Sequence, residues 1–180
     1  MRTQRDVMAG VDAIDSAHRR SKRPRSIVAG PYGHPFHALL VTIPIGAWVA
    51  SIVFDIVAAF SDDPEPFRAG ASLLIAIGIV GAVLAAIVGL LDLSTLGAGT
   101  RVRKIALTHM TLNLAAVAVF AASLVFRSST GFNGESIAGV VCSVIGLVLL
   151  GGSGFLGGEM AYRYGVRVAD EETQRKGFMR

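Results

Sequence analysis

Four ionisable side chains lie inside or beside the long apolar segments of this sequence: His37, Asp92, His109 and Glu159. Each belongs to a different segment, and all four would reach the same face of a membrane. Ionisable groups in or next to lipid are costly, so each is a candidate functional residue whose partner has to be found. Two imidazoles and two carboxylates are ligands suited to a metal or haem centre.

One hypothesis is a b-type haem that serves electron transfer. Haem in a helical bundle needs two axial imidazoles on facing helices at similar depth, together with small residues that admit the macrocycle. His37 and His109 are the candidate axial ligands, and Asn113 lies one turn deeper than His109 on the same side. The glycines that would make room are Gly78, Gly81, Gly154 and Gly157. Because one haem cannot carry electrons across a membrane alone, this hypothesis requires a redox or respiratory membrane-protein partner.

Two alternatives remain open. The first is a non-haem site for Zn, Fe or Mn, with the ligands His37, Asp92, His109 and Glu159. No HExxH or comparable spacing accompanies it, because each ligand comes from a different segment. The second is an accessory or structural subunit of a larger membrane complex, with no cofactor and a polar layer that serves helix packing. The absence of a soluble catalytic domain makes an enzyme the less favoured interpretation.

Each charged residue also has a purely structural interpretation. Asp92 would pair with Arg101 or Arg103, and Glu159 with Arg163 four residues away. A further acidic residue, Asp55, lies about 27 Å along the first segment from His37 at 1.5 Å per residue, too far to share its site. We expect Asp55 to cap the helix or to pair with Arg68.

The elements that position these residues are membrane helices. A bilayer core requires about 20 mostly apolar residues per helix, and the chain is 52% hydrophobic. Candidate spans cover residues 34–60, 67–92, 104–126 and 136–158, which predicts an all-α, polytopic four-helix bundle. In the first span one helix face carries His37, Val41, Pro44, Trp48, Ser51 and Asp55, and Pro44 should bend the helix. A stripe of small residues in the second span predicts a packing face: Gly78, Gly81, Ala85 and Gly89.

The basic residues set the orientation. Fifteen of the 17 Lys and Arg residues lie before the first span, between the second and third, or after the fourth, and only Arg68 and Arg127 lie on the other side. The positive-inside rule therefore predicts that both termini and the middle loop are cytoplasmic. The same distribution explains the basic character of the chain without nucleic-acid binding, because basic residues also attract anionic lipid.

Three regions follow: a basic N-terminal segment (1–33), the four-helix domain (34–168) and a charged cytoplasmic tail (169–180). The spacing of Val7, Met8, Val11 and Ile14 suits a short amphipathic helix that lies on the membrane or docks on a partner. A disordered tail is the equally open alternative.

Several short motifs also resemble a known family. These are His34-Pro35-Phe36-His37 with Ile43-Pro44-Ile45-Gly46, Gly89-Leu90-Leu91-Asp92, His109 with Leu112-Asn113-Leu114, and Gly154-Phe155-Leu156-Gly157-Gly158-Glu159. Over roughly residues 30–168 the chain resembles a bacterial family of four-span membrane proteins, domain of unknown function twenty-two thirty-one. The resemblance implies a multi-pass protein of the bacterial inner (plasma) membrane. Some relatives are fused to a Rieske-type iron–sulfur domain, which implies a redox setting, but this chain has neither that domain nor the cysteines to ligate a cluster.

Overall fold

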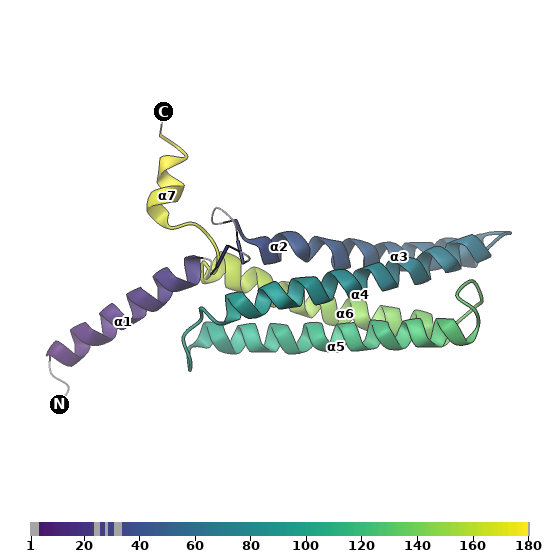
Figure 1. Ribbon diagram of the computed structural model, residues 1–180, viewed down its shortest axis with the longest axis horizontal. Helices are drawn as coiled ribbons and strands as arrows, with labels where there is room; N and C mark the ends of the chain where they lie inside the picture. Colours follow the sequence, from purple (N-terminus) through teal and green to yellow (C-terminus); the bar gives the residue numbers. More distant parts are fainter. Residues whose placement is uncertain (1–3, 24–25, 28, 31–33, 180) are drawn as a thin grey trace.

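The computed structural model describes residues 4–23, 26–27, 29–30 and 34–179, and every regular element in these ranges is a helix (Figure 1). In chain order they are α1 (Gln4–Lys22), α2 (Phe36–Leu40), α3 (Thr42–Phe60), α4 (Glu65–Leu93), α5 (Arg101–Ser129), α6 (Ile137–Gly158), the π-helix η2 (Glu159–Arg163) and α7 (Glu171–Lys176).

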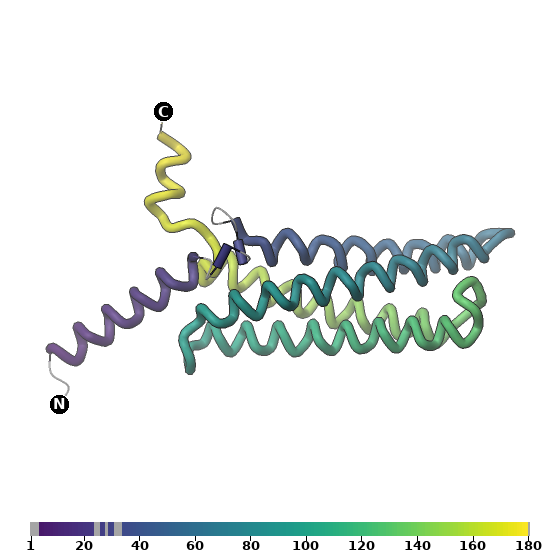
Figure 2. The backbone as a smooth tube through the Cα atoms, viewed as in Figure 1, coloured from purple at the N-terminus to yellow at the C-terminus, as the bar shows by residue number. Residues whose placement is uncertain are grey.

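Four helical segments are long and apolar enough to cross a membrane: Phe36–Phe60, Glu65–Leu93, Arg101–Ser129 and Ile137–Arg163. They pack into one elongated bundle, which confirms the predicted four-span, all-α fold (Figures 1 and 2). Side-chain caps set two of the helix starts, because Thr100 accepts a hydrogen bond from Arg103 N and Ser136 accepts one from Gly139 N. The chain is therefore an integral membrane protein that spans the bilayer several times.

The bundle consists of two helical hairpins. The N-hairpin comprises α2, α3 and α4, and the C-hairpin comprises α5 and α6. Helices pack most extensively within each hairpin and less between hairpins, where α4 meets α5 and α3 meets α6. Helices α3 and α5 thus lie across the diagonal of the bundle, and only long side chains can join them.

The first span is interrupted at Val41, between α2 and α3. Proline has no backbone N–H, and its ring clashes with the carbonyl four residues earlier. Pro44 therefore cannot form the helical hydrogen bond to Leu40 O, and the helix is distorted there. The helical hydrogen bonds resume on either side, from Val41 N to His37 O and from Ile45 N to Val41 O. The predicted distortion at Pro44 therefore occurs one turn before the proline and separates the helix that carries His37 from the rest of the span.

The interior is built from a few large rings and many small residues. Trp48, Ile75 and Phe120 are fully buried and form the centre of the core. Gly78 of α4 lies against Trp48 and Gly146 of α6 lies against Phe120, whereas valine, leucine and isoleucine side chains cover the outer surface. This distribution suits helices that associate in lipid, where close approach of small residues drives packing.

Gly146 offers a test of this packing. A Cβ at this position would lie 2.5 Å from Cε2 of Phe120, which is fully buried and stacked on Trp48, so that any shift of the ring disturbs the core. We expect Gly146→Ala to lower the free energy of unfolding by about 1–3 kcal/mol, because overpacking forces side-chain and backbone shifts. Gly151→Ala in the same helix is the control, since nothing lies within 4 Å of its Cβ. Denaturant unfolding in detergent would measure both; equal effects would contradict the packing argument.

Helices α1 and α7 both leave the bundle at one end, which also holds the α4–α5 loop, and we call this the terminal end (Figure 2). Helix α1 covers Gln4–Lys22 of the N-terminal segment, and its apolar residues Val7, Met8, Val11 and Ile14 are exposed. That this helix lies on a membrane or docks on a partner stays a prediction. Which side of a membrane the terminal end faces stays a prediction from the charge distribution.

Candidate functional site

His37 and His109 lie next to each other in the terminal half of the bundle. Their ring centroids are 6.4 Å apart, and the ring planes are inclined by 80°. His37 comes from α2, which belongs to the same span as α3, and His109 comes from α5, so the two residues lie on spans that are diagonal in the bundle. The two histidines that the sequence singled out as a pair therefore meet across the centre of the bundle.

Hydrogen bonds fix the proton on each ring. Nδ1 of His37 lies 2.8 Å from Ala85 O, and Nδ1 of His109 lies 2.8 Å from Ser153 O. A carbonyl oxygen only accepts, so each Nδ1 carries a proton and donates it. In each neutral ring Nε2 is then the nitrogen with a free lone pair.

The surroundings of the two Nε2 atoms differ. The two N–H groups of Asn113 Nδ2 are shared among three acceptors: His109 Nε2 and His109 O, each at 3.0 Å, and Ser153 Oγ at 2.6 Å. His37 Nε2 has no hydrogen-bond partner among the described residues. Asn113 therefore lies beside His109 as predicted, and His37 is the less saturated of the two imidazoles.

A glycine lies against each ring. A Cβ at Gly89 would lie 3.0 Å from His37 Cε1, and a Cβ at Gly157 would lie 3.3 Å from His109 Cε1. Gly89 lies one turn after Ala85, whose carbonyl accepts from His37. Gly157 lies one turn after Ser153, whose carbonyl accepts from His109. On the Nδ1 side, the two histidines thus contact equivalent positions of α4 and α6.

This equivalence extends over the whole bundle and was not noticed in the sequence. Four pairs of residues are each 72 positions apart: His37/His109, Trp48/Phe120, Ser51/Ser123 and Asp55/Arg127. On the second helices of the hairpins three pairs are 68 positions apart: Gly78/Gly146, Ala85/Ser153 and Gly89/Gly157. The signal was therefore present as a repeated spacing, although most of the residues between these positions differ.

Equivalent residues of the two hairpins contact each other along the bundle axis. Further from the terminal end than the histidines, the rings of Trp48 and Phe120 stack, with centroids 4.1 Å apart and planes inclined by 12°. Further along, Arg127 Nη1 and Nη2 donate to Asp55 Oδ1 and Oδ2 at 2.9 and 2.6 Å. Asp55 was expected to cap the helix or to pair with Arg68, and this was wrong, because Arg68 instead lies 3.5 Å from Glu135.

The two candidate carboxylates do not join the histidines in one ligand sphere. Asp92 Oδ1 lies 3.2 Å from Arg167 Nε, and Glu159 Oε1 lies 3.4 Å from Arg163 Nη1. The structural interpretation of Glu159 is confirmed, whereas the pairing of Asp92 with Arg101 or Arg103 was wrong. Within the described ranges no group of three or more His, Cys, Asp or Glu side chains is placed to hold a metal ion.

Arg167 is the residue at this end that the sequence did not single out. Its side chain is only 7% exposed, and Nη2 donates to Ala29 O and His34 O while its backbone N donates to Ser21 O. Its φ of 60° is in the left-handed region that non-glycine residues rarely adopt. Arg167 therefore connects the segment after the last span to the N-terminal segment and, through Asp92, to the end of α4.

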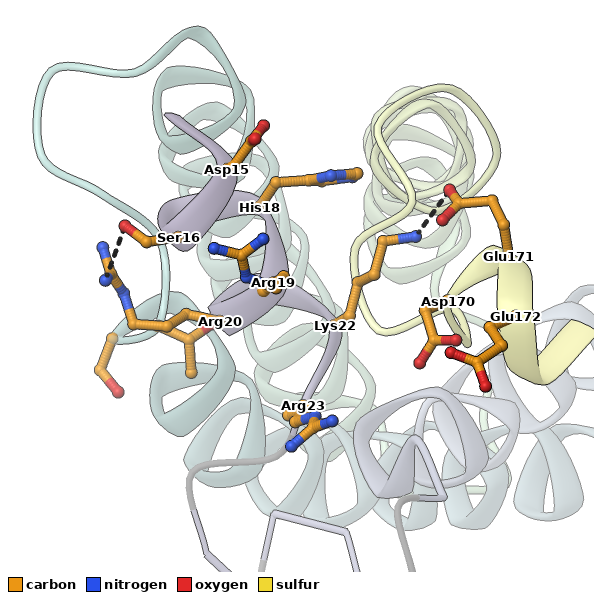
Figure 3. Close-up of a pocket in the computed structure, with 12 residues that line it drawn as sticks. Asp15, Ser16, His18, Arg19, Arg20, Lys22, Arg23, Asp170, Glu171 and Glu172 are labelled. Carbon is orange, nitrogen blue, oxygen red and sulfur yellow. Dashed lines mark hydrogen bonds and ion pairs between the residues drawn. The ribbon is translucent and has the colours of Figure 1, made fainter. Parts of the chain in front are cut away.

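A cavity of about 1100 Å³ opens at the terminal end between α1, Ser94–Thr95 and α7 (Figure 3). Arginines of α1 line one wall and acidic residues of α7 the other, and Lys22 Nζ bridges them to Glu171 at 3.4 Å. The backbone N–H of Thr173 holds the pKa of Asp170 below its ordinary value of 3.8. Hydrogen bonding by its own backbone N–H and by Lys22 likewise lowers the pKa of Glu171. Neither candidate histidine lines this cavity.

Comparison with known proteins gives a family without an established activity. A family model described as a predicted membrane protein, DUF2231, matches residues 33–170. No curated protein and no solved structure matches the chain. The matched range contains all four spans and both histidines, and the model covers well over half of the sequence. The chain therefore belongs to the DUF2231 family of predicted membrane proteins.

Proposed function

We propose that His37 and His109 are the axial ligands of one b-type haem, and that the protein is an electron-transfer subunit of a membrane assembly. The observation that carries this proposal is the separation of the two rings. A metal–imidazole nitrogen bond is about 2.0–2.1 Å, which puts the centroids of two imidazoles on one metal about 6 Å apart. The 6.4 Å between His37 and His109 matches that spacing.

The second support is how each imidazole is held. Histidines that bind a metal usually donate their other N–H to a carbonyl or carboxylate, which fixes the tautomer and leaves the lone pair for the metal. Ala85 O and Ser153 O perform this role here. The repeat places like surroundings on both sides of the axis, which suits a planar ligand with two similar faces.

Binding of a haem would require two changes at this site. Asn113 would release His109 Nε2 and keep its bonds to His109 O and Ser153 Oγ. The macrocycle would enter between the two hairpins, whose mutual contacts are less extensive than those within each hairpin. The bound iron would supply one-electron redox chemistry. Because a single centre near one face cannot span the bilayer, a redox or respiratory partner would be needed to complete the electron path.

A second candidate function is an accessory subunit without a cofactor. The observation that favours it is the saturation of His109, whose two ring nitrogens both have partners within the protein. A polar cluster that satisfies itself in this way also stabilises a membrane bundle. The non-haem site has less support, because Asp92 and Glu159 pair with arginines.

An optical spectrum distinguishes these functions. Protein expressed with a haem precursor should show a Soret band, with sharpened α and β bands after dithionite reduction. We expect His37→Ala and His109→Ala to lose most of the bound haem, whereas His34→Ala, three residues from His37, should retain it. Asp92→Asn and Glu159→Gln should lose little, since these carboxylates would not contact the iron.

Other results of these measurements would contradict the haem proposal. A featureless spectrum with stoichiometric Zn, Fe or Mn that depends on Asp92 and Glu159 would favour the non-haem site. With neither haem nor metal, the accessory function would stand. A Soret band that survives both His37→Ala and His109→Ala would exclude this pair as the ligands.

A further inference from the structure

The two hairpins meet as two subunits of a symmetric dimer would. In a two-fold interface, residues on the axis contact their own equivalents in the other copy. Here Trp48 stacks on its equivalent Phe120, and His37 meets its equivalent His109 edge to face. Each of these contacts joins residues 72 positions apart. The helices of the two hairpins also run in the same directions, since both hairpins begin at the terminal end (Figure 1).

Each of the four residue pairs that are 72 positions apart forms one layer of the bundle. In three of these layers the two hairpins contribute similar side chains. The first layer has a histidine in each, the second an aromatic ring, and the third a fully buried serine, Ser51 or Ser123. Such layers would tolerate the pairing of two N-hairpins or two C-hairpins from different chains almost as well as the observed pairing. Only the fourth layer, Asp55 and Arg127, has opposite charges.

This fourth layer is buried and fully paired. The side chains of Arg127 and Asp55 are 3% and 7% exposed, and the two groups form the bidentate pair described above. Arg127 Nε donates to Ser123 Oγ at 3.3 Å, and Ser123 in turn donates to Gly139 O. A Cβ at Gly139 would lie 2.8 Å from Arg127 Cγ, so the helix backbone of α6 closes over the arginine.

From these observations we infer that Asp55 and Arg127 determine hairpin recognition. They make the two hairpins of one chain recognise each other, and they prevent either from pairing with its equivalent in a second copy. Two N-hairpins would place two Asp55 carboxylates together in the apolar interior, and two C-hairpins would do the same with two Arg127 guanidinium groups. Buried like charges without counterions are strongly unfavourable. The unlike pair therefore works as coiled-coil charges do when they select one partner by penalising the others.

Charge exchange in the full chain tests this inference. We expect Asp55→Arg alone and Arg127→Asp alone to lose most of the monodisperse monomer in detergent. The double variant Asp55→Arg/Arg127→Asp should recover it, with a higher thermal midpoint than either single variant. When the two single variants are co-expressed with different tags, each chain supplies the charge that the other lacks. They should then co-purify as a one-to-one dimer, measured by size exclusion with light scattering.

A neutral pair separates charge from size. Asp55→Asn/Arg127→Gln removes both charges while both side chains stay polar. This variant should fold, but it should form more dimers with a second copy than the unchanged chain does, because no buried like charge then penalises the pairing of equivalent hairpins. The inference would be overturned if the exchanged double variant were no more stable than the single variants. It would also fail if the neutral pair were as unstable as the like-charge variants, because the loss would then not be due to charge.

Discussion

Trp48→Ala is expected to lower the free energy of unfolding by about 3–5 kcal/mol, the range for removing a large buried aromatic side chain. Trp48 is 1% exposed, stacks on Phe120 and donates from Nε1 to Ile75 O at 3.3 Å. Its ring also fills the space that Gly78 leaves open. Alanine would therefore remove the stack and the hydrogen bond and leave a cavity at the centre of the bundle.

Denaturant unfolding in detergent micelles would measure this loss. Phe60→Ala in the same helix is the matched control, because Phe60 is 88% exposed on the outer surface and should change the stability by no more than about 0.5 kcal/mol. A double-mutant cycle with Phe120→Ala should show coupling, since residues in direct contact are not additive. Additive losses, or a Trp48→Ala effect as small as that of Phe60→Ala, would mean that the stack does not hold the hairpins together.

The inward face of the first span could be predicted from the sequence because a helix fixes which residues share a side. His37, Trp48 and Asp55 were assigned to one face by their spacing, and all three turn to the bundle axis. The four spans could be predicted for a related reason, since length and apolarity decide what can cross a bilayer. Both inferences depend only on local geometry.

The partners of the charged residues could not be predicted in the same way. Glu159 pairs with Arg163 four residues away, which helix spacing does predict. Asp55 pairs with Arg127, from a helix on the other side of the bundle, and Asp92 pairs with Arg167 beyond the last span. Nearby charges in the sequence were therefore poor guides, because tertiary packing decides which distant helix ends meet.

The internal repeat was the overlooked source of this information. Had the spacing of 72 residues been recognised, His37 would have led to His109 and Asp55 to Arg127 at once. Asp55 and Arg127 stand at equivalent positions but carry opposite charges, so the two hairpins do not look like copies at this point of the sequence. The same difference is what gives the two hairpins complementary rather than identical surfaces.

Arg167→Met is expected to be the most damaging substitution at the terminal end, at about 3–5 kcal/mol, because it leaves the Asp92 carboxylate buried without its cation. The side chains of Arg167 and Asp92 are 7% and 12% exposed, and the loss of Arg167 Nη2 would also free Ala29 O and His34 O. We therefore expect faster proteolysis of the N-terminal segment together with the lower unfolding free energy.

Arg163→Met is the control for this substitution. The side chains of Arg163 and Glu159 are 67% and 17% exposed. Because the arginine end of this i,i+4 pair is open to water, the pair is worth about 0–1 kcal/mol. Adding Asp92→Leu to Arg167→Met should restore part of the lost stability, since no unpaired charge then remains buried, but it should not restore protection of the N-terminal segment. If Arg163→Met and Arg167→Met cost the same, or if the second substitution restored nothing, the pair with Asp92 would not be what holds Arg167 in place. Recovery of stability without recovery of protection would instead separate the two tasks of Arg167: charge compensation at the end of α4, and attachment of the N-terminal segment through its carbonyl contacts.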